Sequence, residues 1–129
     1  IAAAPHVFVE DLSITSIEAA RRAYETTDLR EKLARHHDDP DSAFRGWNDI
    51  WLDRAFRDWN IERDIEPIRC PVLALQGMDD EYGTLEQIHR IARRVPQARL
   101  LEIEGCGHSP HRDQPERVIA AAMEFAGSR

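Results

Sequence analysis

The stretch between Pro71 and Gly77 most constrains what this chain can fold into. Residues 72–75 form an unbroken apolar run, opened by the proline and stopped by the glycine. A short apolar run without polar alternation is typical of a strand covered on both faces, as in a parallel sheet. We therefore expect helices to follow it and to cover the sheet.

The residues after this strand continue in that pattern. Thr84 and Gln87 form a capping box before an amphipathic helix, and Pro96 ends that helix. A second apolar strand covers residues 100–103, and Asp113 is expected to cap a final helix. The order strand, helix, strand, helix predicts an α/β fold whose parallel strands are joined by a right-handed crossover. Ligands in such sheets gather at the carboxyl ends of the strands.

The first half of the chain has a different pattern. Residues 1–10 end in an apolar segment that predicts a strand already under way, and we expect the chain to be truncated before Ile1. Residues 11–66 are helical in pattern, with Thr15 and Glu18 as a capping box. This helical stretch holds all three tryptophans of the chain in one short window.

Size and charge exclude several functional classes. The chain has 129 residues, which suits one domain, and a formal net charge of −7. This charge gives no electrostatic case for binding nucleic acid or an anionic membrane, whereas a small-molecule ligand stays open. The longest apolar run, 118–123, is far too short to span a bilayer. Cys70 and Cys106 are too few for a disulfide framework, so we expect a soluble protein of a reducing, cytoplasmic compartment.

Two candidate catalytic side chains follow the two strands. Asp80 lies three residues past Gly77, and His108 lies five residues past Ile103. If the strands are neighbours, both loops leave the same edge of the sheet, and a carboxylate there can fix the tautomer of a catalytic imidazole. These residue types predict two members of a Ser-His-Asp triad.

These two segments resemble those of the α/β-hydrolase family. The resemblance rests on residues 70–80 (Cys-Pro-Val-Leu-Ala-Leu-Gln-Gly-Met-Asp-Asp), on residues 105–111 (Gly-Cys-Gly-His-Ser-Pro-His) and on the closing helix. It implies that Asp80 is the triad acid and His108 the base. It also implies a partial α/β-hydrolase fold with a few parallel strands, flanking helices and a helical cap insertion.

The resemblance assigns a place to each part of the chain. Residues 1–10 would be a strand of the hydrolase core, 11–66 a helical cap or lid, and 67–129 the C-terminal part of the core. Family members carry a Gly-x-Ser-x-Gly elbow upstream, and none of the five serines here has that glycine pattern. We therefore expect the nucleophile in an N-terminal half outside this chain, and the chain alone to be inactive.

The resemblance implies hydrolysis of an ester or related carbonyl compound without a cofactor. A carbon–carbon bond hydrolase acting on a diketone is an alternative, as is a non-enzymatic interaction module left from such an enzyme. Without the N-terminal half, the first strands of this chain would leave apolar edges and faces exposed unless something covers them. The expected partner is a second copy of the chain or a complementary N-terminal half.

Several other side chains are secondary candidates. Asp79 is a spare acid, and Glu10 is a further candidate for the acid or for a pocket or cap-hinge residue. Trp47, Trp51 and Trp59 either line a substrate channel or fill the core of the cap, and their helical spacing favours the core.

Two histidine clusters could be read as metal ligands. His108 and His111 lie three residues apart on a proline-containing loop and lack the i, i+4 spacing of helical ligands. The run His36-His37-Asp38-Asp39 has no evident histidine partner on another helix. No metal site is expected.

Overall fold

The computed structural model describes residues 1–127, which form two compact units. The first unit comprises Ile1–Phe8 and the chain from Asn60 onward, and the second comprises Val9–Trp59. Of the segment expected to form a cap, residues 60–66 thus belong to the first unit. Ser128 and Arg129, the end of the segment expected to complete the core, lie outside the described residues.

The first unit is built on a parallel sheet of three strands, which confirms the expected α/β class. The strands are β1 (Ala2–Ala3), β2 (Val72–Gly77) and β3 (Ala98–Ile103), in the order β1-β2-β3. Both pairings are parallel, and Gly77 at the end of β2 lies opposite Ile103 at the end of β3. The two longer strands therefore end level with each other.

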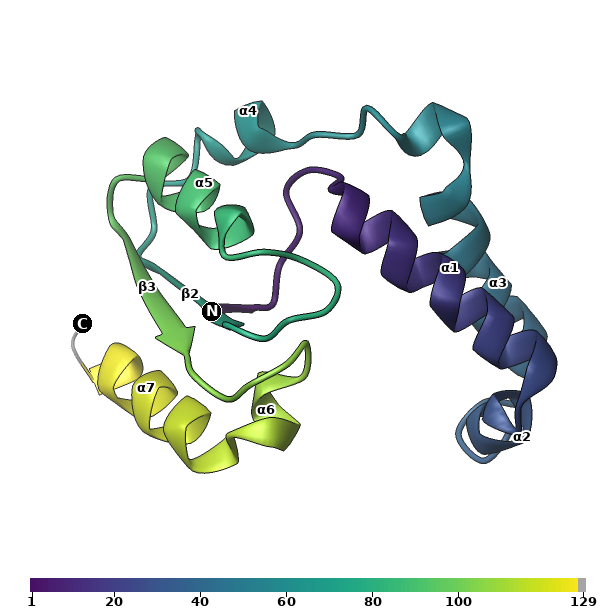
Figure 1. Cartoon of the computed structure of the whole chain (residues 1–129). Helices are drawn as coiled ribbons and strands as arrows, with labels where there is room; N and C mark the ends of the chain where they lie inside the picture. Colours follow the sequence, from purple (N-terminus) through teal and green to yellow (C-terminus); the bar gives the residue numbers. More distant parts are fainter. Residues whose placement is uncertain (128–129) are drawn as a thin grey trace. The chain divides into compact units, whose positions relative to one another are not determined.

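Helices cover both faces of this sheet (Figure 1). Successive side chains of a strand point to opposite faces. On one face Ala74 packs with Ile88 and Ile91 of helix α5 (Glu86–Arg94). On the other face Leu73, Leu75 and Ile103 pack with Phe125 of helix α7 (Pro115–Gly127). The continuous apolar run at 72–75 is thus explained by burial on both sides.

The second unit is helical. Its elements are α1 (Asp11–Thr26), α2 (Leu29–Leu33), α3 (Pro40–Leu52) and the 3₁₀ turn η1 (Arg54–Phe56). The buried Asn48 amide donates to the carbonyl of Ile17 at 3.0 Å, and Tyr24 stacks on Phe44 with the ring centres 4.0 Å apart. These two contacts, one polar and one aromatic, are among those that join α1 to α3.

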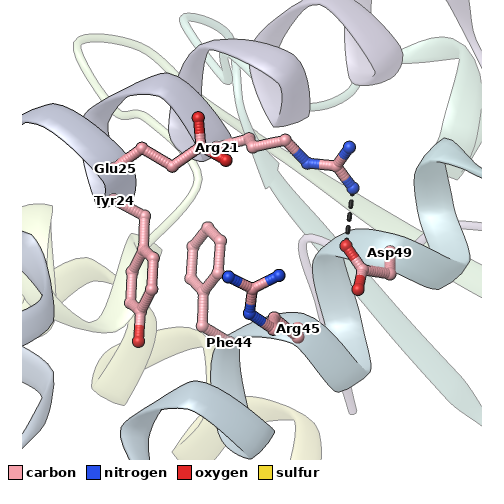
Figure 2. A pocket seen from close by; sticks show the side chains of 6 residues that line it. All are labelled: Arg21, Tyr24, Glu25, Phe44, Arg45 and Asp49. Atoms are coloured by element: carbon pink, nitrogen blue, oxygen red, sulfur yellow. Dashed lines mark hydrogen bonds and ion pairs between the residues drawn. The ribbon is translucent and has the colours of Figure 1, made fainter.

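A small hollow lies between α1 and α3 (Figure 2). Arg21 crosses it to Asp49, at 2.6 Å, in an ion pair that is largely exposed. The remaining lining residues come from the same two helices: Tyr24, Glu25, Phe44 and Arg45. None of the three tryptophans is among these lining residues.

The N-terminal strand differs from the expectation. Strand β1 covers only Ala2–Ala3 and does not extend to Glu10. The backbone beyond it is held by a side chain: the Gln87 amide accepts from the Val7 N–H at 2.7 Å and donates to the Phe8 carbonyl at 3.1 Å. Gln87 is fully buried. It therefore ties α5 to residues 7–8.

Helix α5 also holds the chain on either side of the second unit. The Arg90 guanidinium lies over the Phe8 ring, 3.6 Å from its centre, and donates to the Glu62 carboxylate at 2.7 Å. Glu62 opens the short helix α4 (Glu62–Ile65), and Phe8 forms an antiparallel bridge with Asn60. The segments that lead into and out of the second unit are thus fastened to one helix of the first.

Two expected helix starts are wrong. Helix α1 begins at Asp11, and Thr15 lies inside it, where its hydroxyl donates to the Asp11 carbonyl at 3.0 Å. Asp113 ends the short helix α6 (Pro110–Asp113), and α7 begins at Pro115. The Asp113 carboxylate instead accepts from the N–H of Gly107 at 3.0 Å. Within residues 1–127, no helix has both the length and the apolar character needed to cross a membrane.

Candidate active site

The site lies where β2 and β3 end, and a glycine brings their loops together. A Cβ atom on Gly77 would lie 2.0 Å from the carbonyl oxygen of Cys106, so a side chain there would overlap the backbone of the neighbouring loop. The loops are also hydrogen-bonded: Met78 N–H donates to Ile103 O at 2.9 Å, and Asp79 N–H donates to Cys106 O at 3.0 Å. The two loops are therefore held in register at their base.

The carboxylate of Asp80 is buried and held by several donors. Its side chain is 1% exposed. One oxygen accepts from the N–H of Tyr82 at 2.8 Å and from that of Gly83 at 3.3 Å. The other accepts from the Gln76 amide at 3.2 Å, and the same amide donates to the Gly83 carbonyl at 2.7 Å. These bonds fix the orientation of the carboxylate independently of His108.

Asp80 and His108 meet as expected from the sequence. Nδ1 of His108 lies 3.0 Å from each carboxylate oxygen of Asp80. An ionised carboxylate only accepts hydrogen bonds, so Nδ1 carries a proton, and in the neutral ring Nε2 is left as the basic atom. The His108 side chain is 34% exposed, so the ring is anchored on one side and accessible on the other.

The environment lowers the pKa of Asp80 and raises the pKa of His108. Burial is the largest influence on the Asp80 carboxyl and opposes ionisation, but the hydrogen bonds from His108, Tyr82 and Gly83 together hold its pKa below the usual value. The hydrogen bond to Asp80 is the main cause that raises the pKa of His108, against the effect of burial. The charges of Asp80 and Glu81 raise it further. Both shifts favour the state in which an ionised Asp80 lies beside a protonated His108.

Two further rings lie beside the imidazole. The Tyr82 ring centre is 4.9 Å from that of His108, and the His6 ring centre is 5.7 Å away. Sequence reasoning did not place His6 at the site. The signal was its place just after β1, since the carboxyl ends of neighbouring parallel strands share one edge of the sheet.

The structure distinguishes the two adjacent acids. The Asp79 side chain is exposed, whereas Asp80 is buried and bonded to the ring of His108. His111 is exposed on α6. Within the part of the chain that is described, no group of three or more His, Cys, Asp or Glu residues is arranged to hold a metal ion.

The other predicted site residues belong to the second unit. Glu10 occupies the N-cap position of α1 without capping it through its side chain, and its carbonyl accepts from the Ile14 N–H at 3.2 Å. This places Glu10 two residues beyond the boundary between the units.

The three tryptophans take part in aromatic contacts within that unit. Trp47 meets Phe44 edge to face, with the ring centres 5.7 Å apart. Trp51 and Trp59 are 6.0 Å apart, and Phe56 lies 5.3 Å from both. These contacts agree with a role in packing, and a role of the tryptophans in a substrate pocket stays a prediction.

Curated relatives match parts of the chain. The provisionally named carbamate hydrolase RutD of Caulobacter sp. (strain K31) is 36% identical over 72 residues, which cover 56% of this chain and 27% of that protein. The pimeloyl-[acyl-carrier protein] methyl ester esterase of Aromatoleum aromaticum is also 36% identical, over 48% of this chain and 24% of the esterase. The matches thus span about a quarter of the length of these relatives.

Solved structures share the fold over nearly the whole chain. The meta-cleavage product hydrolase of Pseudomonas fluorescens (CumD) superposes with a TM-score of 0.62 over 98% of this chain and 54% of that chain, at 18% identity. At this identity the likeness bears on the fold alone.

The sequence model of the alpha/beta hydrolase family matches residues 2–121. This match covers most of the chain, and the parallel sheet with helices on both faces agrees with it. The chain therefore belongs to the α/β-hydrolase family.

Proposed function

We propose that this chain carries the acid and the base of a serine-type α/β-hydrolase, with Asp80 as the acid and His108 as the base. The observation that carries the proposal is the buried Asp80 carboxylate bonded to Nδ1 of a ring that is still accessible. The nucleophilic serine would lie in a segment outside this chain, because none of its serines lies in a Gly-x-Ser-x-Gly sequence.

In the proposed reaction His108 transfers protons in both directions. Its Nε2 takes the proton of the serine hydroxyl as the oxygen attacks the substrate carbonyl, and it then gives that proton to the leaving group. Water hydrolyses the acyl-enzyme by the same route and restores the serine. Asp80 remains ionised throughout and stabilises the imidazolium that forms in each step.

The proposed substrate is a small molecule with an ester or related carbonyl group. Two observations support this class: the matching relatives are named as a carbamate hydrolase and a methyl ester esterase, and the chain belongs to the α/β-hydrolase family. The aromatic cluster of Trp51, Phe56 and Trp59 would favour a bulky apolar group if it borders the site.

The proposed partner covers the edge of the sheet. Strand β1 lies at one edge and, among the described residues, pairs only with β2. A sheet edge without a partner invites pairing with another strand. The partner is therefore a second copy of the chain or a complementary N-terminal half. Light scattering of the purified chain tests this part of the proposal. A monodisperse, well-folded monomer would contradict it.

The test of the enzymatic proposal uses protein that includes the coding region upstream of Ile1. Hydrolysis of p-nitrophenyl esters is measured for the parent, for His108→Ala and for the matched control His111→Ala, whose exposed side chain lies three residues further along. We expect the first variant to lose activity by several orders of magnitude, about 10³-fold or more, and the control to keep it. Activity that survives in His108→Ala would refute the role of His108.

The same proteins distinguish the alternative reactions. A ring-containing diketone assayed beside the esters tests cleavage of a carbon–carbon bond by the same acid and base. If the upstream region contains no Gly-x-Ser-x-Gly sequence and neither substrate is turned over, the chain is better described as a binding module.

A further inference from the structure

The turn that carries His108 is held by two carboxylates from different elements. The N–H of Gly107 donates to Asp113 at 3.0 Å, and the N–H of His108 donates to Glu81 at 3.2 Å. A Cβ atom on Gly107 would lie 3.2 Å from the Glu81 oxygen and 3.3 Å from the Asp113 oxygen. Glycine at this position therefore lets both carboxylates approach the backbone closely.

Glu81 differs from Asp113 in its relation to the acid. It directly follows Asp80, so one short segment contacts His108 at two points: Asp80 binds the ring and Glu81 binds the backbone amide. Asp113 belongs to α6 and accepts from the backbone amide of Gly107, the residue before His108. Of these two carboxylates, Glu81 is therefore the one that links the backbone of His108 to the loop that carries the acid.

The charge of Glu81 also acts on the imidazole. Among the described residues, the Asp80 carboxylate binds the ring, the Tyr82 and His6 rings lie beside it, and the Glu81 carboxylate binds the backbone amide of the same residue. Among the causes that raise the pKa of His108, the hydrogen bond to Asp80 comes first, and the charges of Asp80 and Glu81 follow. A negative charge bonded to the backbone amide of His108 favours the protonated form of its ring.

We propose that Glu81 is a positioning residue for His108, whose carboxylate fixes the backbone of the base and whose charge stabilises the protonated imidazole. The inference rests on the proposed function for its importance in catalysis. Its geometric and electrostatic content concerns His108 itself and is measurable without any turnover.

The charge effect is tested by NMR titration of the six histidines in the purified chain, with His108→Gln used to assign the His108 ring. Glu81→Gln keeps an acceptor and removes the charge. We expect it to lower the titration midpoint of His108 by about 0.3 unit or more, as expected for loss of a nearby charge. Glu81→Asp restores the charge and should restore most of the shift. The control Glu116→Gln removes an exposed carboxylate on α7 and should leave the midpoint in place.

The backbone contact is tested through the amide protons of the same turn. In Glu81→Ala the amide resonance of His108 should move upfield while that of Gly107 stays, and in Asp113→Ala the two responses should be exchanged. A His108 midpoint in Glu81→Gln equal to that in Glu116→Gln, or an unchanged His108 amide in Glu81→Ala, would overturn the proposal. Because these readouts need no substrate, their failure is separate from failure of the proposed hydrolase activity.

Discussion

The carbonyl oxygen of Cys106 lies where the side chain of any residue other than glycine at position 77 would begin. The distance from that oxygen to a Cβ atom on Gly77 would be 2.0 Å, and the carbonyl oxygen of Gly107 would be 2.4 Å away. Backbone atoms in hydrogen-bonded loops cannot retreat as the end of a flexible side chain can. The approach of the acid loop to the histidine loop therefore depends on the absence of a side chain at Gly77.

Gly77→Ala should consequently destabilise the first unit. We expect a loss of about 2–4 kcal/mol in the free energy of unfolding, because the loops must separate or the strand ends must shift. Urea denaturation, monitored by circular dichroism, measures this free energy. Gly46→Ala is the control: a Cβ atom there meets nothing within 4 Å, and the residue lies inside α3, so alanine should stabilise by about 0.5–1 kcal/mol. Equal stabilities of the two variants would contradict the close approach.

The adjacent acids Asp79 and Asp80 should respond differently to the same substitution. Asp80→Asn replaces an acceptor bonded to Nδ1 with a group that can favour the wrong tautomer of His108, so the proposed esterase activity should fall by about 10⁴-fold. Asp79→Asn changes an exposed side chain and should reduce kcat/KM by less than about threefold. The measurement is kcat/KM on p-nitrophenyl esters with protein that includes the upstream region. The reverse order of effects would assign the acid to Asp79.

The stability of the first unit should depend on pH through the Asp80–His108 pair. The folded-state pKa of His108 is raised from 6.5, so its contribution is fully present below about pH 6.5 and is lost as the pH rises through the raised value. The folded-state pKa of Asp80 is lowered from 3.8, so its contribution is present above that pH and is lost as the pH falls through the lowered value. The pair thus stabilises most between these limits.

Urea denaturation at a series of pH values tests this linkage. Relative to the parent, Asp80→Asn should show a flatter dependence of the unfolding free energy both below pH 4 and above pH 6.5. His89→Gln is a useful control, since His89 is a half-exposed histidine on α5 that pairs with Glu102 outside the site. A parent profile that coincides with that of Asp80→Asn would show that the pair contributes nothing to stability.

Gln87 should matter for stability although it has no place in the proposed chemistry. Gln87→Leu leaves the buried N–H of Val7 and the carbonyl of Phe8 without their partner, and each unsatisfied group costs about 1–3 kcal/mol. We expect a total loss of about 2–4 kcal/mol in thermal or urea unfolding. Gln97→Leu is the matched control, because its exposed amide also donates to backbone carbonyls, those of Ile68 and Cys70, and solvent can replace it. Similar losses in both variants would contradict the role of Gln87.

The sequence by itself determined the alternation of strands and helices and the meeting of Asp80 with His108. The apolar run at 72–75 requires burial on both faces, and the ends of parallel neighbours must lie at one edge. With strand ends level at Gly77 and Ile103, loops of three and five residues bring the two side chains together. Local patterns and the geometry of a parallel sheet were sufficient for that result.

Only the tertiary structure decided the partners of the polar side chains. Gln87 and Asp113 both fit helix-capping patterns, yet one binds the backbone of residues 7–8 and the other binds the amide of Gly107. The place of His6 beside His108 likewise depended on contacts across the sheet edge. A short polar side chain can satisfy any donor or acceptor within reach, so its choice depends on which distant groups the folded chain brings near it and removes from water.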